Sequence, residues 1–321
     1  MADKKRILMT RRLTPDVVAR AERDYELVLN EDDHVMNQSE ILEKAAGADA
    51  ILCCITENYS ADLIARLPGS VKILAAFSVG TNHIDLAAAR QRGLRVGNTP
   101  DAVTISTAEI AMLLILGAAH RAGEGERMLR ARAWPGWEPM QLLGTRLGGK
   151  RLGILGLGQI GQAVAARARA FDMEIHYHNR NRLPGDTARG AHYHQTLDVL
   201  LGFSDVLSLH APSTPQTQHC IDMAAIEKLP AGAILVNAAR GDLVVDADVI
   251  AALKTNRLAA AGLDVYDGEP DIHEGYYDLE NAFLLPHMGT STLEARNEMG
   301  FAALDNIDAV LAGRDPVYPV V

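Results

Sequence analysis

The sequence has few of the features that mark secreted or membrane-spanning proteins. Its 321 residues include three cysteines, Cys53, Cys54 and Cys220. The number of cysteines is odd, and two are adjacent while the third stands alone. This pattern matches neither a disulfide framework nor a metal-ligand spacing, and it is typical of a protein in a reducing compartment. The longest apolar run, residues 110–119, is about half the length that a bilayer-spanning helix needs, and no signal-peptide core follows the N-terminus. We therefore expect a cytoplasmic protein without a membrane partner.

The chain also has fewer positively than negatively charged residues. The chain has 31 Lys and Arg against 41 Asp and Glu, a net charge of −10. A nucleic-acid backbone would be repelled, so we expect no nucleic-acid partner. Aromatic residues make up only 5%, but 48% hydrophobic and 22% charged residues are an ordinary globular mixture. The length indicates about two domains.

What the sequence does contain is an alternation of short apolar runs with helical patterns. Such alternation is typical of βαβ units and parallel sheets. Five runs of strand-like composition lie in the first third: 7–9, 27–29, 50–55, 71–77 and 94–96. After the apolar helix predicted at 103–120 and an irregular segment at 131–149, six more follow: 151–155, 174–178, 206–209, 233–237, 260–265 and 283–285.

The last element is predicted to be a helix that runs to about residue 311. Ser291 and Glu294 stand three residues apart at its start, which is the pattern of a capping box.

A glycine-rich turn follows the strand at 151–155 and opens a predicted helix. Gly156, Gly158 and Gly161 form a GxGxxG pattern that also contains Gln159 and Ile160. In this strand-to-helix context the glycines allow a tight turn, close approach of a pyrophosphate, and close helix packing. The helix N-terminus adds N–H groups and partial positive charge. The pattern predicts a dinucleotide-binding site.

The end of the next strand distinguishes NAD(H) from NADP(H). A carboxylate there would bind the ribose 2′-hydroxyl and repel a 2′-phosphate. The sequence instead has Asn179, followed by Arg180 and Arg182. We therefore expect NADP(H) to be preferred, with NAD(H) as the second possibility.

Three polar residues follow strand ends in the second half of the chain. They are Arg240, Glu269 and His287. Ligands of open α/β sheets bind at the carboxyl ends of the strands. The three side chains are therefore candidates for one catalytic site, which would need a proton donor and a cation for an anionic substrate.

Together these motifs resemble the D-isomer-specific 2-hydroxyacid dehydrogenase family. The resemblance covers nearly the whole chain, and within the family it is strongest to the NADP-dependent glyoxylate and hydroxypyruvate reductases. The segments that carry it are 77–83, 98–104, 107–109, 134–137, 156–161, 179–180, 237–242, 262–265 and 286–289.

The resemblance implies a role for each catalytic candidate. His287 would donate a proton to the substrate carbonyl oxygen as hydride reaches the carbonyl carbon, and would remove it in reverse. Glu269 would hold the imidazole, and Arg240 would bind the carboxylate of a 2-oxo acid and polarise its carbonyl. The N–H groups of Val79 and Gly80 would also bind that carboxylate.

The resemblance further implies a cofactor site, a fold and an assembly. Asp264 would position the nicotinamide carboxamide. In a homodimer, Trp137 would either reach the substrate pocket of the partner or pack at the interface. The implied fold class is α/β, with two Rossmann-like or flavodoxin-like domains on parallel sheets. A cofactor domain at 104–286 would be inserted into a substrate domain formed by 1–103 and 287–321, with the active site in the cleft. The other cofactor-binding residues implied are Thr107, Pro212, Thr217, Ala238, His287 and Gly289.

The expected reaction is NADPH-dependent reduction of glyoxylate or hydroxypyruvate to glycolate or D-glycerate. Reduction of 2-ketogluconate or another 2-oxo acid is an alternative within the family. A dinucleotide-sensing protein like the transcriptional corepressors is an alternative from another class. Two H-x-H pairs, His176 with His178 and His192 with His194, lack a completing ligand in the sequence pattern, and we expect no metal site.

Overall fold

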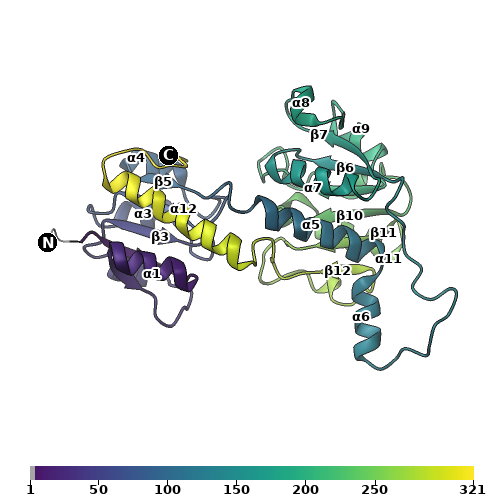
Figure 1. Cartoon of the computed structure of the whole chain (residues 1–321), viewed down its shortest axis with the longest axis horizontal. Helices are drawn as coiled ribbons and strands as arrows, with labels where there is room; N and C mark the ends of the chain where they lie inside the picture. Colours follow the sequence, from purple (N-terminus) through teal and green to yellow (C-terminus); the bar gives the residue numbers. More distant parts are fainter. Residues whose placement is uncertain (1–3) are drawn as a thin grey trace. The chain divides into compact units, whose positions relative to one another are not determined.

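The computed structural model describes residues 4–321, which form two compact units, each built on a parallel sheet (Figure 1). The predicted α/β fold class with two parallel sheets is confirmed. One unit combines the chain up to Val103 with Thr290–Val321, and the other spans Thr104–Gly289. The return to the first unit therefore comes at 290, three residues later than the predicted 287. Hydrogen bonds from Met288 and to Gly289, described below, hold these residues in the second unit.

The first unit has a five-stranded sheet in the order β2-β1-β3-β4-β5. Its strands are short and almost wholly apolar, as expected of a parallel sheet covered on both faces. The core includes Leu8, Ile51, Leu74 and Val96. The strands are β1 (Arg6–Met9), β2 (Glu26–Leu29), β3 (Ala50–Cys53), β4 (Ile73–Ala76) and β5 (Arg95–Gly97). The helices are α1 (Pro15–Asp24), α2 (Gln38–Lys44), α3 (Ala61–Arg66), α4 (Leu86–Arg92) and α12 (Leu293–Leu311).

Several predicted boundaries in this unit are wrong by one or two residues. The strand expected to reach residue 55 ends at Cys53, because the next N–H group, that of Cys54, donates to the Glu57 carboxylate at 2.9 Å. The final helix is capped by Thr292, whose hydroxyl accepts from the N–H of Ala295. The cap thus lies one residue beyond the predicted Ser291.

The second unit has a seven-stranded sheet in the order β12-β11-β10-β9-β6-β7-β8, with all pairs parallel. The chain order reverses between β6 and β9, and the carboxyl ends beside such a reversal are where α/β sheets bind ligands. The strands are β6 (Arg151–Leu155), β7 (Glu174–His178), β8 (His192–Tyr193), β9 (Val206–Leu209), β10 (Ala233–Asn237), β11 (Leu258–Leu263) and β12 (Ala282–Leu284). The helices are α5 (Thr104–Ala119), α6 (Ala122–Arg130), α7 (Gln159–Arg169), α8 (Gly185–Ala188), α9 (Leu197–Gly202), α10 (Met223–Ile226) and α11 (Asp246–Lys254), with 3₁₀ turns η1 (Gly241–Leu243) and η2 (Glu274–Tyr276).

Helix α5 packs against α7, β10 and β11 of its own unit. Most of its residues are buried, while Ile105 and Leu113 are exposed. Within residues 4–321 no single helix is long and apolar enough to cross a membrane; α5 and α6 reach that length and composition only as a pair bent by 71°.

Candidate active site

The glycine turn between β6 and α7 has the geometry that the sequence pattern predicts. Gly156 has a φ of +97°, and a Cβ placed on it would lie 2.7 Å from the main-chain N of Ala211 and C of His210. A side chain there would therefore clash with backbone that cannot move. Gly158 is the N-cap of α7 and supplies no side-chain cap, and a helix start of this kind presents N–H groups to a phosphate. The turn fits a dinucleotide diphosphate.

The loop after β7 carries the residues predicted to select the cofactor. The Oδ1 of Asn179 accepts from the N–H of Leu157 at 2.6 Å, so this side chain ties the loop to the glycine turn. Arg180 and Arg182 are exposed. The guanidinium carbon of Arg182 lies 5.7 Å from the centre of the Tyr193 ring, and neither arginine forms an ion pair with a described carboxylate.

The segment after β9 lines the other side of the reversal point. His210 follows this strand, and its Nε2 lies 2.8 Å from the Ser208 hydroxyl. Burial lowers the pKa of His210 to about 4, so the ring is neutral at physiological pH. The hydroxyl of Thr217 donates to the carbonyl of Pro212 at 2.7 Å and accepts from the N–H of Thr214 at 2.8 Å. Thr217 and Pro212 were both predicted to contact the cofactor. In the structure the hydroxyl of Thr217 holds its own loop together, and Pro212 is exposed to solvent.

His287 and Glu269 form the hydrogen-bonded pair expected of a proton relay. The imidazole Nδ1 lies 2.8 Å from Oε1 of Glu269. A carboxylate accepts hydrogen bonds, so the tautomer with a proton on Nδ1 fits this contact. His287 has a φ of +54°, a conformation that non-glycine residues rarely adopt and that is often found at functional sites.

Arg240 lies in the turn after β10 and has few partners of its own. Its Nη1 donates only to the neighbouring carbonyl of Ala239, at 2.6 Å. Burial lowers the pKa of the guanidinium, opposed by the charges of Glu269 and Asp242. No carboxylate among residues 4–321 forms an ion pair with it, so its remaining N–H groups can bind an anion.

Asp264 is hydrogen-bonded to the segment that carries His287. It is 1% exposed, and its Oδ1 accepts from the N–H of Met288 at 2.6 Å. Burial raises the pKa of Asp264, opposed mainly by this hydrogen bond. On the other side the hydroxyl of Thr107 donates to the carbonyl of Gly289 at 3.1 Å. Both residues were predicted to contact the cofactor, and the structure shows each of them holding the 287–289 turn.

Comparison with known proteins identifies the family of this chain. Residues 112–289, more than half of the chain, match the family model for the NAD-binding domain of D-isomer-specific 2-hydroxyacid dehydrogenases. The chain belongs to the D-isomer-specific 2-hydroxyacid dehydrogenase family. It is an enzyme of that family, and its cofactor is a nicotinamide dinucleotide. The family predicted from the sequence is therefore confirmed.

Several relatives cover nearly the full chain. A glycerate dehydrogenase of Hyphomicrobium methylovorum is 49% identical over 98% of both chains. A glyoxylate reductase of Thermococcus litoralis is 37% identical over 98% of this chain and 96% of its own. Among solved structures, the NADPH-dependent glyoxylate/hydroxypyruvate reductase of Sinorhizobium meliloti has a TM-score of 0.88 at 30% identity, covering 99% of this chain and 98% of its own.

Three residues that the family resemblance assigned to the substrate lie elsewhere in the chain. Val79 and Gly80 belong to the first unit, in the loop after β4. Trp137 is 80% exposed in the loop between α6 and β6, which projects beyond α6 in Figure 1. That loop leads into the amino end of β6, whereas His287 and Arg240 follow strand carboxyl ends. Within one chain, the structure does not bring Trp137 to the catalytic pair.

Asn237 was not among the predicted site residues, yet it fixes the turn that carries Arg240. It is fully buried at the end of β10, where its Nδ2 donates to the carbonyl of Arg240 at 2.8 Å and its Oδ1 accepts from the N–H of Ala239 at 3.0 Å. These bonds fix the turn that presents Arg240, beside Ala238. An amide in an otherwise apolar strand, three residues before an arginine, was the available signal.

The histidine pairs form a cluster at the β7–β8 edge of the sheet. Oε1 of Glu174 lies 3.2 Å from Nε2 of both His176 and His192, and Nδ1 of His176 lies 2.8 Å from Nε2 of His194. A carboxylate that the sequence pattern did not place here thus joins the pairs. Within residues 4–321 no group of three or more such side chains is arranged to hold a metal ion.

Proposed function

We propose that this dehydrogenase reduces a short 2-oxo acid, glyoxylate or hydroxypyruvate, to glycolate or D-glycerate with NADPH. The observation that carries the proposal is the 2.8 Å contact between His287 and Glu269. Two further observations support it: Arg240 has few hydrogen-bond partners, and the glycine turn fits a dinucleotide. These residues and the turn all follow the carboxyl ends of strands in one sheet. The names of the glyoxylate reductase and glycerate dehydrogenase relatives support the substrate class.

Each residue has a definite task in this reaction. Arg240 binds the carboxylate and polarises the carbonyl through its planar set of donors. When bound, NADPH supplies the hydride that the carbonyl carbon receives. His287 donates a proton from Nε2 to the carbonyl oxygen, and Glu269 holds Nδ1 so that Nε2 faces the substrate. The ring then regains its proton from solvent.

The preference for NADPH rests on the loop after β7. Asn179 carries no charge that would repel a 2′-phosphate, and Arg180 and Arg182 have no carboxylate partner among the described residues. Hydrogen bonds to a charged group contribute about 1.5–3 kcal/mol each. The Sinorhizobium meliloti enzyme, described as NADPH-dependent and also solved in complex with NADP, supports the same choice.

The proposal extends to the first unit and to a second copy of the chain. The N–H groups of Val79 and Gly80 bind the substrate carboxylate. The protein is a homodimer, in which the 131–149 loop carries Trp137 toward the partner's substrate. The exposed apolar side chains of Trp137, Met140 and Leu143 support an interface there, because large apolar groups rarely stay exposed together without a partner. Size-exclusion chromatography with light scattering tests the dimer, and a monomer would contradict it.

One assay tests the function itself. NADPH oxidation is measured over glyoxylate, hydroxypyruvate, 2-ketogluconate and pyruvate, and repeated with NADH. We expect the highest kcat/KM with glyoxylate or hydroxypyruvate and NADPH. If 2-ketogluconate is the best substrate, the enzyme is a 2-ketogluconate reductase of the same family. Tight cofactor binding without turnover of any 2-oxo acid would favour a dinucleotide-sensing protein.

A further inference from the structure

Four arginines in the described part of the chain have a pKa that is lowered overall, with burial as the largest cause. They differ in the hydrogen-bond acceptors that their guanidinium groups contact. A buried cation without acceptors is unfavourable, so each should have oxygen partners. Arg92 donates to the carbonyls of Ile64, Leu67 and Pro68. Arg169 donates to the carbonyls of residues 188 and 189. These two arginines are satisfied by the fold.

The other two are Arg240 and Arg296. Arg240 donates to one neighbouring carbonyl, and it is already the proposed anchor for the substrate carboxylate. The guanidinium of Arg296 makes no hydrogen bond or ion pair with any residue in 4–321. It lies over the ring of Phe77, 5.7 Å from the centroid, and the Cys54 thiol is the group whose charge would act on its pKa. By this criterion Arg296 is even more open to an anion than Arg240.

The carboxylate nearest in the sequence to Cys54 is already occupied. Glu57 is 2% exposed. Its Oε2 accepts from the hydroxyl of Thr10 and the N–H of Cys54, both at 2.9 Å, and its Oε1 accepts from the hydroxyl of Thr56 at 2.6 Å. Glu57 thus accepts three hydrogen bonds, two from its own loop and one from Thr10 in the β1–α1 loop, and it forms no ion pair with Arg296 among the described residues.

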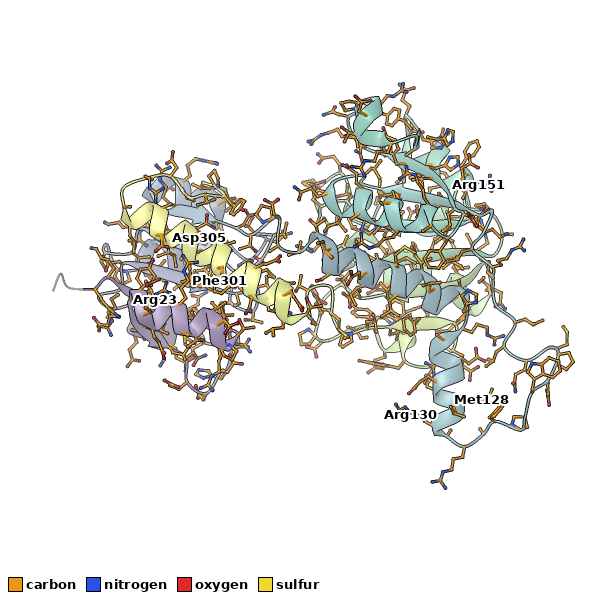
Figure 2. The ribbon with its side chains drawn as sticks, viewed as in Figure 1. Arg23, Met128, Arg130, Arg151, Phe301 and Asp305 are labelled. Carbon is orange, nitrogen blue, oxygen red and sulfur yellow. The ribbon has the colours of Figure 1, made fainter. Side chains whose placement is uncertain are left out.

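The helix that carries Arg296 is firmly fixed. The adjacent Asn297 accepts from the Thr14 hydroxyl and donates to Asp16 at 3.0 Å. A Cβ on Gly300 would lie 2.4 Å from Val17, so α12 approaches α1 closely. Figure 2 labels Phe301 and Asp305 on the same helix, where Arg20 of α1 contacts both. These contacts fix the part of α12 from which the Arg296 side chain extends over the Phe77 ring.

The loop beside Arg296 offers matching donors. Phe77 directly follows β4 and leads into Val79 and Gly80. The carbonyl of Val79 accepts from Asn98 at 2.8 Å, and the carbonyl of Gly80 accepts from Ser78 at 2.7 Å. Their N–H groups make no hydrogen bond to a described residue. Two unused N–H groups and an unpartnered guanidinium thus occur in one part of the first unit.

We propose that Arg296 is the charged member of an anion site on the first unit, and that it binds the carboxylate of the 2-oxo acid together with the Val79 and Gly80 N–H groups. A planar guanidinium can bind a carboxylate through two parallel hydrogen bonds. The inference rests on the proposed function, because it takes the substrate from it.

The test compares Arg296→Gln and Arg296→Lys with Arg92→Gln as the matched control. In Arg296→Gln we expect KM for glyoxylate and hydroxypyruvate to rise about 10- to 100-fold, the effect of losing a charged hydrogen bond. The Kd of NADPH, measured by fluorescence, should not change. Lys should restore part of the loss because it keeps the charge. Arg92→Gln should lower Tm and leave KM unchanged.

A second measurement does not depend on turnover. Oxalate, a non-reacting carboxylate, should raise the Tm of the wild-type enzyme with NADPH and have a much smaller effect on Arg296→Gln. Unchanged KM and an unchanged oxalate effect would overturn the inference, whether or not Tm falls. If Arg296→Gln does not fold, the same readouts on Arg296→Lys decide it. A wild-type enzyme that reduces no 2-oxo acid would instead refute the proposed function.

Discussion

His210 should make the second unit sensitive to mild acid. In the folded chain burial holds the pKa of His210 at about 4, against 6.5 for a free histidine. The folded state therefore favours the neutral ring, and its stabilising contribution is complete above pH 6.5. That contribution is lost as the pH falls from 6.5 towards 4, because the unfolded chain binds the proton first.

The size of the effect follows from the two values. At about 1.4 kcal/mol per pKa unit, the full difference is about 3 kcal/mol. By pH 5 the unfolded ring is almost entirely protonated and the folded ring hardly at all, so about 2 kcal/mol has gone. For a protein stable by roughly 5–15 kcal/mol, this is a large fraction.

The assay is urea unfolding at pH 7, 6 and 5 of the wild type and of His210→Gln. Glutamine can keep a hydrogen bond to Ser208 but does not titrate. We expect the free energy of unfolding to fall about 2 kcal/mol more in the wild type than in the variant between pH 7 and 5. Burial also lowers the pKa of His176 and His194, but both proteins share these groups. Equal losses in the two proteins would refute the reasoning.

Three further predictions concern catalysis and the cofactor. His287→Gln should lower kcat about 10²- to 10⁴-fold, the usual contribution of a proton donor, and leave the Kd of NADPH unchanged by fluorescence titration. Replacing Arg180 and Arg182 together with alanine should lower the ratio of kcat/KM for NADPH to that for NADH by about 10- to 100-fold. Gly156→Ala should weaken NADPH binding and lower Tm, because the added Cβ would lie 2.7 Å from the backbone N of Ala211; calorimetry measures both.

Each of these has a matched control and a contrary outcome. His120→Gln changes an exposed histidine and should keep full activity; near-normal kcat in His287→Gln would contradict the proton-donor role. Arg90→Ala removes an exposed charge outside the cofactor loop, and an unchanged cofactor ratio in the double variant would contradict the phosphate contact. Gly202→Ala adds a Cβ where nothing lies within 4 Å, so equal effects of the two alanines would rule out the clash.

The sequence predicts the two sheets well, because strands depend on local pattern. Apolar runs bounded by turns located most strands, and the polar residues at their ends were candidates because parallel strands end at one edge. The two-residue strand His192–Tyr193 was missed because it is too short to show periodicity. Helix α6 was missed because Gly123 and Gly125 lower its helix propensity.

Contacts between distant residues lie beyond a reading of local patterns. Thr107 and Asp264 stand 182 and 24 residues from their partners Gly289 and Met288, and nothing in the local sequence shows that they hold the catalytic turn. The same holds for Arg296. Its lack of a partner is visible only when the surrounding acceptors are known.

The discontinuous first unit constrains the order in which the chain can fold during synthesis. Helix α12 packs on β3, β4 and β5, and the N–H of Val96 donates to the carbonyl of Val321 at 3.1 Å. These contacts cannot form until the ribosome has made residues 293–321. The second unit, which is continuous in sequence, can fold earlier. A nascent chain therefore holds an incompletely covered parallel sheet throughout the synthesis of the second unit, and in that interval it depends most on chaperones.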